Sequence, residues 1–392
     1  MQAEHDVALQ DTDRLEGRAA LVNNVKAAVA LAGAVRSTLG PRGLDKMLVS
    51  EDGDCLVTND GVTVIEAAKV EHPTARLLIS ASSSQDKSAR DGTTSTVILT
   101  AELLQNSLEL VRMGIHPSVV INGFLLAERE AISELDRVSR KADSTEELKA
   151  VISTTLAGKI GESLASHITE IAFDAADLLS DEEGGDDLER LRVKRLQVSG
   201  GSTADSRLVN GLMIAKTRVD ISTPPSSEGG IIAIIDGGLE NVKLEMDAEI
   251  EVSSPGVLRG FHDRSLDKLR EEVGHLSSLG VDLLIVKDGI SDDAISMLSE
   301  AGITSYRRFE REDLERLSKI TGTSMVRRPT RISEDDLGRF TSRREEIVAG
   351  ITHSVIEGSE GGALTVVIRG TSPQIREAAG RAVADAMGVS FR

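Results

Sequence analysis

Residues 91–104 read DGTTSTVILTAELL, and this stretch decides how the rest of the chain is interpreted. Asp91 and Gly92 precede three hydroxyl-bearing residues, Thr93–Ser95, and the apolar residues that follow recur at helical spacing. A helix that begins here would point its first N–H groups at a bound phosphate, and the Asp91 carboxylate would suit Mg²⁺. The simpler interpretation is an Asp N-cap followed by a polar first turn. Taken alone, the stretch leaves both interpretations open.

Three further segments carry the same ambiguity. Residues 38–43, TLGPRG, contain two glycines that would let backbone N–H groups approach an anion, but Gly-Pro is also a strong helix stop. Asn59-Asp60-Gly61 follows a predicted strand and, by itself, predicts a hairpin turn. Asp385 lies in a predicted helix at 372–387, where a single Asp is normally a surface residue.

The pattern of apolar residues divides the chain into three regions. The first is nearly all helical, with helices predicted at 17–39, 62–69, 74–86, 93–113 and 118–138, a further helix that starts at a capping box, Ser144–Glu147, and a second one at 160–179. In the second, strands are predicted at 193–198, 208–216, 231–236, 248–253, 281–287 and 364–369, and helices at 262–278, 291–301, 311–321 and 334–338. The last segment, 372–387, is helical again. The sequence therefore predicts an α/β domain inserted within a helical one.

The composition excludes several classes of function. The chain has 392 residues and a formal net charge of −19, so it would repel a phosphate backbone. Only 2% of the residues are aromatic, which argues against a base-stacking surface. Cys55 is the sole cysteine, the N-terminus lacks an apolar signal core, and no run approaches a membrane span. We expect a cytoplasmic protein with no nucleic-acid or membrane partner. The acid excess is typical of proteins that work in concentrated salt, although solubility alone would also explain it.

Taken together, these segments resemble the nucleotide-binding half of the chaperonin family. The resemblance is carried by TLGPRGLDKML, VTNDGVTVI, VEHPTARLLI, DGTTSTVILTAELL and IHPSVVINGF, in this order. Four segments further along resemble the substrate-binding domain of the archaeal and eukaryotic class of chaperonins (group II, the thermosome and TCP-1 type). They are DAEIEVSSP, VDLLIVKDGISDDA, AGITSYRRFEREDLERLSKITGTSMV and SEDDLG. The resemblance covers roughly residues 16–387. It implies an ATP-dependent molecular chaperone that binds unfolded or partly folded proteins and assists their folding.

The resemblance also implies roles for single residues, with ATP and Mg²⁺ as cofactors. Asp91 would bind Mg²⁺, and Asp60 and Asp385 match two family carboxylates that orient or deprotonate the attacking water. The nucleotide and its phosphates would be bound by Thr38, Leu39, Gly40, Pro41, Gly61, Gly92, Thr93, Thr94 and Ser95.

The fold that the resemblance implies is a multidomain α+β chaperonin architecture with an inserted α/β apical domain. We expect a flexible N-terminus at 1–16, a helical equatorial ATP-binding domain at 17–138, a first intermediate segment at 139–205, an apical substrate-binding domain with a helical protrusion at 206–365, and a second intermediate segment at 366–392. The family continues well past Asp385 and closes the equatorial domain there. We therefore expect an incomplete equatorial part with an exposed apolar face, and a small oligomer or aggregation-prone monomer unless other chaperonin subunits associate with it.

Two residues depart from the family pattern and keep a second hypothesis open. Arg90 stands where Gly usually precedes DGTT, and Ser83 stands where many relatives carry Lys. With the short C-terminus, this leaves an ATPase-deficient holdase or accessory subunit, using only the apical domain, as the alternative. A small-molecule kinase is disfavoured because no Walker A motif is present. Apolar client contacts are expected around Leu258, Phe261, Leu266 and Leu269, unless these residues pack the base of the protrusion.

Overall fold

The chain forms two compact units. The computed structural model describes residues 16–391, apart from 51, 54, 69, 180–191, 241–254 and 360–361. One unit comprises Met1–Thr169 and Arg381–Ser390, and the other comprises Glu170–Gly380 and Phe391–Arg392. The N-terminus expected at 1–16 lies, except for its last residue, outside the described residues. This division into two units does not test the five domain ranges expected from the sequence, which stay predictions.

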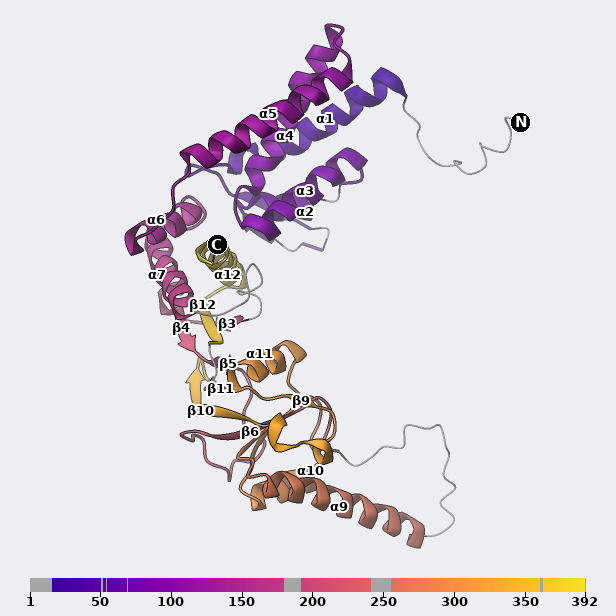
Figure 1. The fold of residues 1–392 in the computed structure, drawn as a ribbon, viewed down its shortest axis with the longest axis vertical. Coiled ribbons are helices and arrows are strands. Elements are labelled where there is room, and N and C mark those ends of the chain that lie inside the picture. Colours follow the sequence, from indigo (N-terminus) through magenta and orange to yellow (C-terminus); the bar gives the residue numbers. More distant parts are fainter. Residues whose placement is uncertain are drawn as a thin grey trace, which may run out of the picture. The chain divides into compact units, whose positions relative to one another are not determined.

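The first unit is mainly helical (Figure 1). Its elements are α1 (Gly17–Val35), a 3₁₀ turn (Arg36–Thr38), the hairpin β1 (Lys46–Val49) and β2 (Cys55–Thr58), α2 (Gly61–Ala67), α3 (Pro73–Ala89), α4 (Thr93–Arg112), α5 (Pro117–Val138) and α6 (Thr145–Leu156). Helix α1 packs against α3 and α4. The core between these helices is aliphatic and includes Leu31, Val35, Ile65, Leu78 and Val97.

Local signals account for most of these boundaries. Of the capping box predicted before α6, the Ser144 half is present, because Ser144 Oγ accepts a hydrogen bond from the Glu147 N–H at 3.2 Å. The Glu147 side chain accepts from the Asp143 N–H at 3.1 Å in place of the Ser144 N–H that a full capping box would use. Helix α1 and its 3₁₀ turn end before Gly40, which has a φ of 84°, so the predicted helix stop is confirmed. The hairpin turn predicted at Asn59-Asp60-Gly61 is wrong. Strand β2 already pairs with β1 upstream, and Asp60 instead caps α2.

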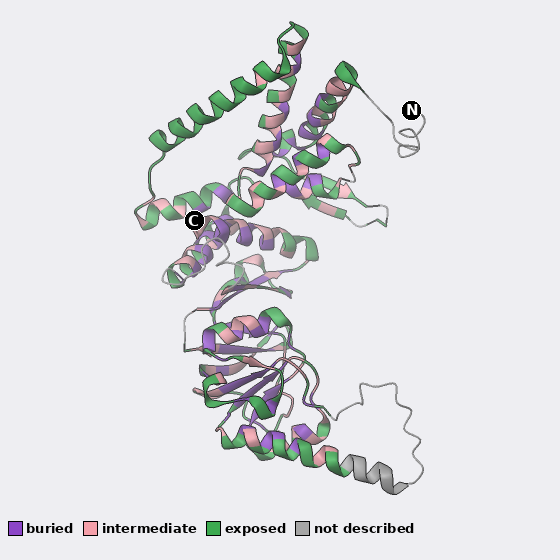
Figure 2. Cartoon of the chain, turned by 45° about the vertical axis from the view of Figure 1, so that its right-hand side comes forward, coloured by how far each residue is buried: buried purple, intermediate pink, exposed green. Residues whose placement is uncertain are grey.

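Helix α5 contributes nothing to the core of its unit. None of its residues, all of which the structure describes, is buried, and Figure 2 shows the helix almost entirely exposed. Its exposed large apolar side chains are Val119, Ile121, Phe124, Leu125, Leu126, Ile132, Leu135 and Val138. The apolar face expected on this part of the chain is therefore present.

The second unit contains two sheets. In the smaller one, β12 (Leu364–Gly370) lies between β3 (Val193–Ser199), to which it is parallel, and β4 (Arg207–Asn210), to which it is antiparallel. The larger sheet has the order β5-β11-β10-β6-β7-β8, and β9 pairs with β6. Its strands are β5 (Leu212–Ile214), β6 (Gly230–Ile235), β7 (Leu283–Val286), β8 (Thr304–Tyr306), β9 (Met325–Val326), β10 (Gly338–Val348) and β11 (Ile351–Gly358).

Helices cover the larger sheet on both faces because its central strands are apolar on both sides. Ile232 and Ile234 of β6 pack in one cluster with α11 (Arg311–Thr321), whereas Ala233 and Ile235 pack in another with α9 (Pro255–Ser278) and α10 (Asp292–Glu300). The remaining helices are α7 (Glu162–Leu178) and α12 (Pro373–Ser390). The mixed helix and sheet content that the sequence predicts is therefore present. No helix in the described part of the chain is long and apolar enough to cross a membrane.

Some predictions for the second unit need correction. The helix predicted at 334–338 is a 3₁₀ turn, Glu334–Asp336, closed by a capping box with Ser333. The strand predicted at 248–253 lies outside the described residues, as do the side chains of Leu258 and Phe261. Leu269 is buried in the core between α9 and the sheet, so its role is packing.

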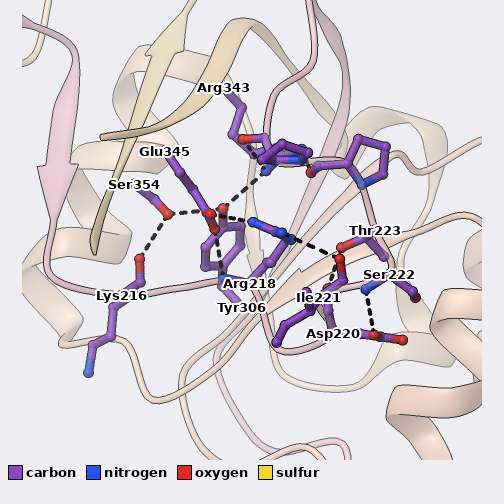
Figure 3. Close-up of polar contacts among 12 residues, drawn as sticks. Lys216, Arg218, Asp220, Ile221, Ser222, Thr223, Tyr306, Arg343, Glu345 and Ser354 are labelled. Carbon is purple, nitrogen blue, oxygen red and sulfur yellow. Dashed lines mark hydrogen bonds and ion pairs between the residues drawn. The ribbon is translucent and has the colours of Figure 1, made fainter. Parts of the chain in front are cut away.

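A buried polar network joins the segment 216–227 to the larger sheet (Figure 3). Arg343, only 1% exposed, donates to the Pro224 carbonyl at 2.6 Å and to Tyr306 Oη at 3.2 Å. Ser354 Oγ lies 3.0 Å from the same Tyr306 oxygen. Arg218 forms an ion pair with Glu345 on β10. These bonds satisfy polar groups that would otherwise be costly to bury.

Candidate nucleotide-binding site

Four loops of the first unit meet at a cavity of about 300 Å³. They are the turn after α1, the β2–α2 junction, the start of α4, and the segment after α6. The cavity is lined by Thr38, Leu39, Gly40, Pro41, Asn59, Asp60, Gly61, Asp91, Gly92, Thr93, Thr94, Ser95, Thr154, Thr155, Ala157, Gly158 and Lys159. Every residue that the resemblance implies for nucleotide or Mg²⁺ is on this lining. Of the predicted site residues, only Asp385 is absent from it.

The start of α4 is arranged to accept an anion. Gly92 has a left-handed φ of 77° and precedes the helix, and no side chain caps the first turn. The Asp91 side chain accepts a hydrogen bond from the Gly92 N–H at 2.9 Å, and Gln85 Nε2 donates to the Asp91 carbonyl at 3.0 Å. The first N–H groups of α4 therefore face the cavity, where the positive end of the helix dipole favours negative charge.

Two of the loops pack directly against each other. A Cβ atom on Gly61 would lie 2.1 Å from Thr94 Oγ1, which is far below any normal contact distance. Only glycine therefore allows the β2–α2 junction to approach the start of α4 this closely. Asp60, just before Gly61, caps α2, with Oδ2 accepting from the Thr63 N–H at 3.0 Å. The cap fixes the Asp60 side chain at the cavity wall.

Lys159 connects the cavity to Asp385. Its Nζ lies 2.7 Å from Asp385 Oδ2 and 3.9 Å from Asp91 Oδ1. Burial opposes the charge of Lys159, but the Asp385, Asp91 and Asp60 carboxylates together raise the pKa of the ammonium group. Lys159 is the functional residue that the motifs do not indicate. The only sequence signal is a lysine in a glycine-flanked loop, Gly158–Gly161.

Asp385 lies in a setting that favours its protonated form. Burial raises its pKa to about 6, against the opposing effect of Lys159, and the charges of Asp60 and Asp86 raise it further. Helix α12 thus brings Asp385 behind the cavity, and not to the surface as a single helical Asp would predict.

The donor set of the cavity fits Mg²⁺ bound together with phosphate. Asp91 presents a half-exposed carboxylate, and Asp60 is a second carboxylate residue on the cavity lining. Among the described residues, no three His, Cys, Asp or Glu side chains gather as a metal site of their own. Mg²⁺ typically binds through one or two carboxylates and completes its octahedral shell with water and substrate phosphates. The residues present therefore suit a Mg²⁺–nucleotide complex better than a metal alone.

Comparison with known proteins identifies the family. The model of the TCP-1/cpn60 chaperonin family matches residues 31–392. The chain belongs to this family. The resemblance to a group II chaperonin subunit that the motifs indicated is confirmed, and this chaperonin is accordingly a molecular chaperone.

Several thermosome subunits are similar to this chaperonin. A thermosome subunit of Pyrococcus horikoshii is 35% identical over 386 residues. Thermosome subunit beta of Thermococcus kodakarensis is 36% identical over 386 residues, and thermosome subunit alpha of Methanothermobacter thermautotrophicus is 34% identical over 381 residues. Each alignment covers 97% of this chain and 70% of the relative.

Proposed function

We propose that this chaperonin binds Mg²⁺-ATP in the cavity described above and couples ATP hydrolysis to the folding of other proteins. One observation carries the proposal. Loops that the family resemblance assigned to nucleotide or Mg²⁺ line a single cavity, although they are far apart in the chain. Phosphoryl transfer depends mainly on positioning and charge stabilisation, and such a convergence supplies both.

The residues of the cavity would have different roles in nucleotide binding. Asp91 would hold Mg²⁺, which when bound offsets the negative charge of the phosphates. The backbone N–H groups and hydroxyls of Gly92–Ser95 would bind phosphate oxygens at the start of α4. Residues 38–41 and Gly61 would form the opposite wall.

Asp60 and Asp385 would act on the attacking water. Asp385 is ionised above a pH of about 6, so near neutral pH it can accept a hydrogen bond or a proton from water. Asp60 keeps one carboxylate oxygen on the α2 cap, which holds the group in a fixed orientation. The ion pair with Lys159 would hold the Asp385 carboxylate in position, and the ammonium group would add positive charge where phosphates would bind.

The domain organisation and partners belong to the same proposal. The segment 17–138 would form the ATP-binding domain, 139–205 and 366–392 the intermediate links, and 206–365 the apical domain that binds unfolded polypeptide. Because the similar proteins are named thermosome subunits, we infer that other chaperonin subunits are partners of this chain. The alternative of an ATPase-deficient holdase is not favoured, since all four cavity loops are present.

Calorimetry and turnover measurements test the proposal. Asp91→Ala should weaken binding of Mg²⁺-ATP, whereas Asp385→Asn should spare binding and abolish hydrolysis. Asp136→Asn, on the exposed face of α5, is the matched control and should change neither. Suppression of aggregation of a denatured protein, with and without ATP, separates a folding machine from a holdase. Equal Mg²⁺-ATP affinity of wild type and Asp91→Ala would remove Asp91 from the site.

A further inference from the structure

Arg90 has a backbone conformation that is unusual for its residue type. It ends α3 with φ 56° and ψ 7°, in the left-handed region. Among the residues that the structure describes, only Arg90, Arg308 and Ala349 are non-glycine residues with a positive φ. Glycine adopts this conformation without steric cost and is the usual residue after a helix end. An arginine at this position therefore carries a conformational cost, which points to a use for its side chain.

The aliphatic stem of Arg90 packs against the last turn of α12. A Cβ atom on Gly388 would lie 2.3 Å from Arg90 Cγ and 3.2 Å from Arg90 Cδ. No side chain at 388 fits at such distances, so the stem occupies the space that this side chain would take. Gly388 is buried and follows Asp385 by about one helical turn. The stem therefore supports the part of α12 that carries Asp385.

The guanidinium group of Arg90 lies beside the carboxylate of Asp86. Its Nη1 lies 3.6 Å from Asp86 Oδ2, and both side chains are half-buried. Burial raises the pKa of Asp86, Arg90 lowers it, and the charges of Asp60 and Glu66 raise it. Asp86 in turn raises the pKa of Asp385. Arg90 thus offsets a negative charge that acts on Asp385.

We propose that Arg90 is a positioning residue for the nucleotide site. Its stem holds the last turns of α12, so that the Asp385 carboxylate stays against Lys159, and its guanidinium group offsets Asp86. This inference rests on the proposed function, because Asp385 acts on water only there. If Arg90 only ends α3 and forms an ion pair at the surface, a different result is expected for its replacement by glycine. Arg90→Gly would then relieve the backbone strain and leave α12 unchanged.

Amide hydrogen exchange of the nucleotide-free protein tests the positioning role without any ATPase activity. We expect Arg90→Gly to speed exchange at residues 383–390 roughly tenfold, with α1 unchanged as the internal control. Arg90→Met, which keeps most of the stem, should retain most of the protection. Gly388→Ala should loosen the same residues, because its methyl group meets the Arg90 stem. The double variant should recover part of the protection, since the methyl group then enters vacated space.

Measurements of ATP turnover distinguish a failure of this inference from a failure of the proposed function. Arg90→Gly should lower kcat for ATP roughly tenfold through the misplacement of Asp385, with the Kd for Mg²⁺-ATP unchanged. A wild-type protein that does not hydrolyse ATP would contradict the proposed function, whereas the exchange rates would still decide the role of Arg90. Wild-type exchange at 383–390 in Arg90→Gly would overturn the inference. If that variant does not fold, wild-type exchange in Gly388→Ala would overturn it equally.

Discussion

Lys159 Nζ lies 2.7 Å from Asp385 Oδ2, although 226 positions separate the two residues. The same ammonium group lies 3.9 Å from Asp91 Oδ1. One cation therefore faces both the predicted Mg²⁺ ligand and a predicted catalytic carboxylate. Lys159 thus places one positive charge beside both carboxyl groups and offsets the repulsion between negative charges there.

Removing that cation should destabilise the first unit. Lys159→Met leaves the Asp385 carboxylate buried without a partner, which we expect to cost about 3 kcal/mol of unfolding free energy at neutral pH. Urea denaturation followed by circular dichroism measures this loss. Lys141→Met, an exposed lysine of the same unit, is the control and should cost less than about 0.5 kcal/mol. Equal losses in the two variants would show that the Lys159–Asp385 pair contributes no stability.

The titration of Asp385 should be visible in the pH dependence of stability. Its folded pKa of about 6 lies above the ordinary value of 3.8, so between these values the folded protein holds a proton that the unfolded chain has lost. The stabilisation from this proton is complete below a pH of about 4 and is lost as the pH rises through about 6. The shift corresponds to about 3 kcal/mol.

Asp385→Asn isolates this contribution because an amide does not titrate. We expect the unfolding free energy of wild type, relative to the variant, to fall by about 3 kcal/mol between pH 4 and pH 7. Any constant offset from the altered partner of Lys159 cancels in this difference, because the lysine stays charged over the range. Parallel curves for the two proteins would mean that the pKa of Asp385 is not raised.

The close approach of two loops predicts a sensitive glycine. Gly61→Ala would place a methyl group 2.1 Å from Thr94 Oγ1 and force the start of α4 away from the β2–α2 junction. We expect Mg²⁺-ATP binding, measured by calorimetry, to weaken roughly tenfold, or about 1.4 kcal/mol. Gly123→Ala on α5 is the matched control, because a Cβ atom there meets nothing within 4 Å. It should leave binding unchanged.

The hydrogen-bond network around Arg343 predicts that substitution of this residue lowers the stability of the second unit. Arg343→Met removes the donors to Tyr306 Oη and to the Pro224 carbonyl, so that Tyr306 Oη keeps only its hydrogen bond with Ser354. The expected loss is about 2–3 kcal/mol in guanidinium denaturation. Arg339→Met lies on the same strand, but its side chain is exposed, so it should be nearly neutral. A neutral Arg343→Met would mean that the segment 216–227 is held by other contacts.

The apolar face of α5 predicts self-association of this 392-residue chain. Leu126 and Leu135 are 62% and 64% exposed, so Gln at both positions should leave stability within about 0.5 kcal/mol. Light scattering should show smaller particles for the double variant than for wild type. Molar salt should enlarge the difference, because it screens repulsion and strengthens apolar contacts. Glu130→Gln, also exposed on α5, should scatter like wild type.

Helices with chemically marked ends could be predicted from the sequence, whereas strands with charged faces could not. The helix predicted at 93–113 is observed at Thr93–Arg112, because Asp91-Gly92 marks its start. The hairpin of β10 and β11 escapes prediction because charged pairs such as Arg344–Glu357 stand where apolar alternation would be expected. Its strands are fixed by cross-strand pairing, which a local pattern does not show.

The candidate site likewise contains parts that could be predicted from the sequence and parts that could not. Its loops could be predicted from their resemblance to the chaperonin motifs, whereas each loop taken alone also fits a helix stop, a hairpin turn or an N-cap. Lys159 could not, because its importance depends on Asp385, which only the folding of α12 brings near. The Asn59-Asp60-Gly61 turn was mispredicted as a hairpin because turn residues also cap helices, and the pairing of β2 with β1 decides between the two.

Tyr306 is the only tyrosine of the chain, and there is no tryptophan. It is fully buried in the second unit, with its hydroxyl group bonded to Arg343. Tyrosine emission from this protein therefore originates in the second unit alone, since the first unit holds neither tyrosine nor tryptophan. The protein thus carries a natural single-site fluorophore, so that unfolding of the second unit can be followed in the intact chain without a label, and compared with circular dichroism, which records both units.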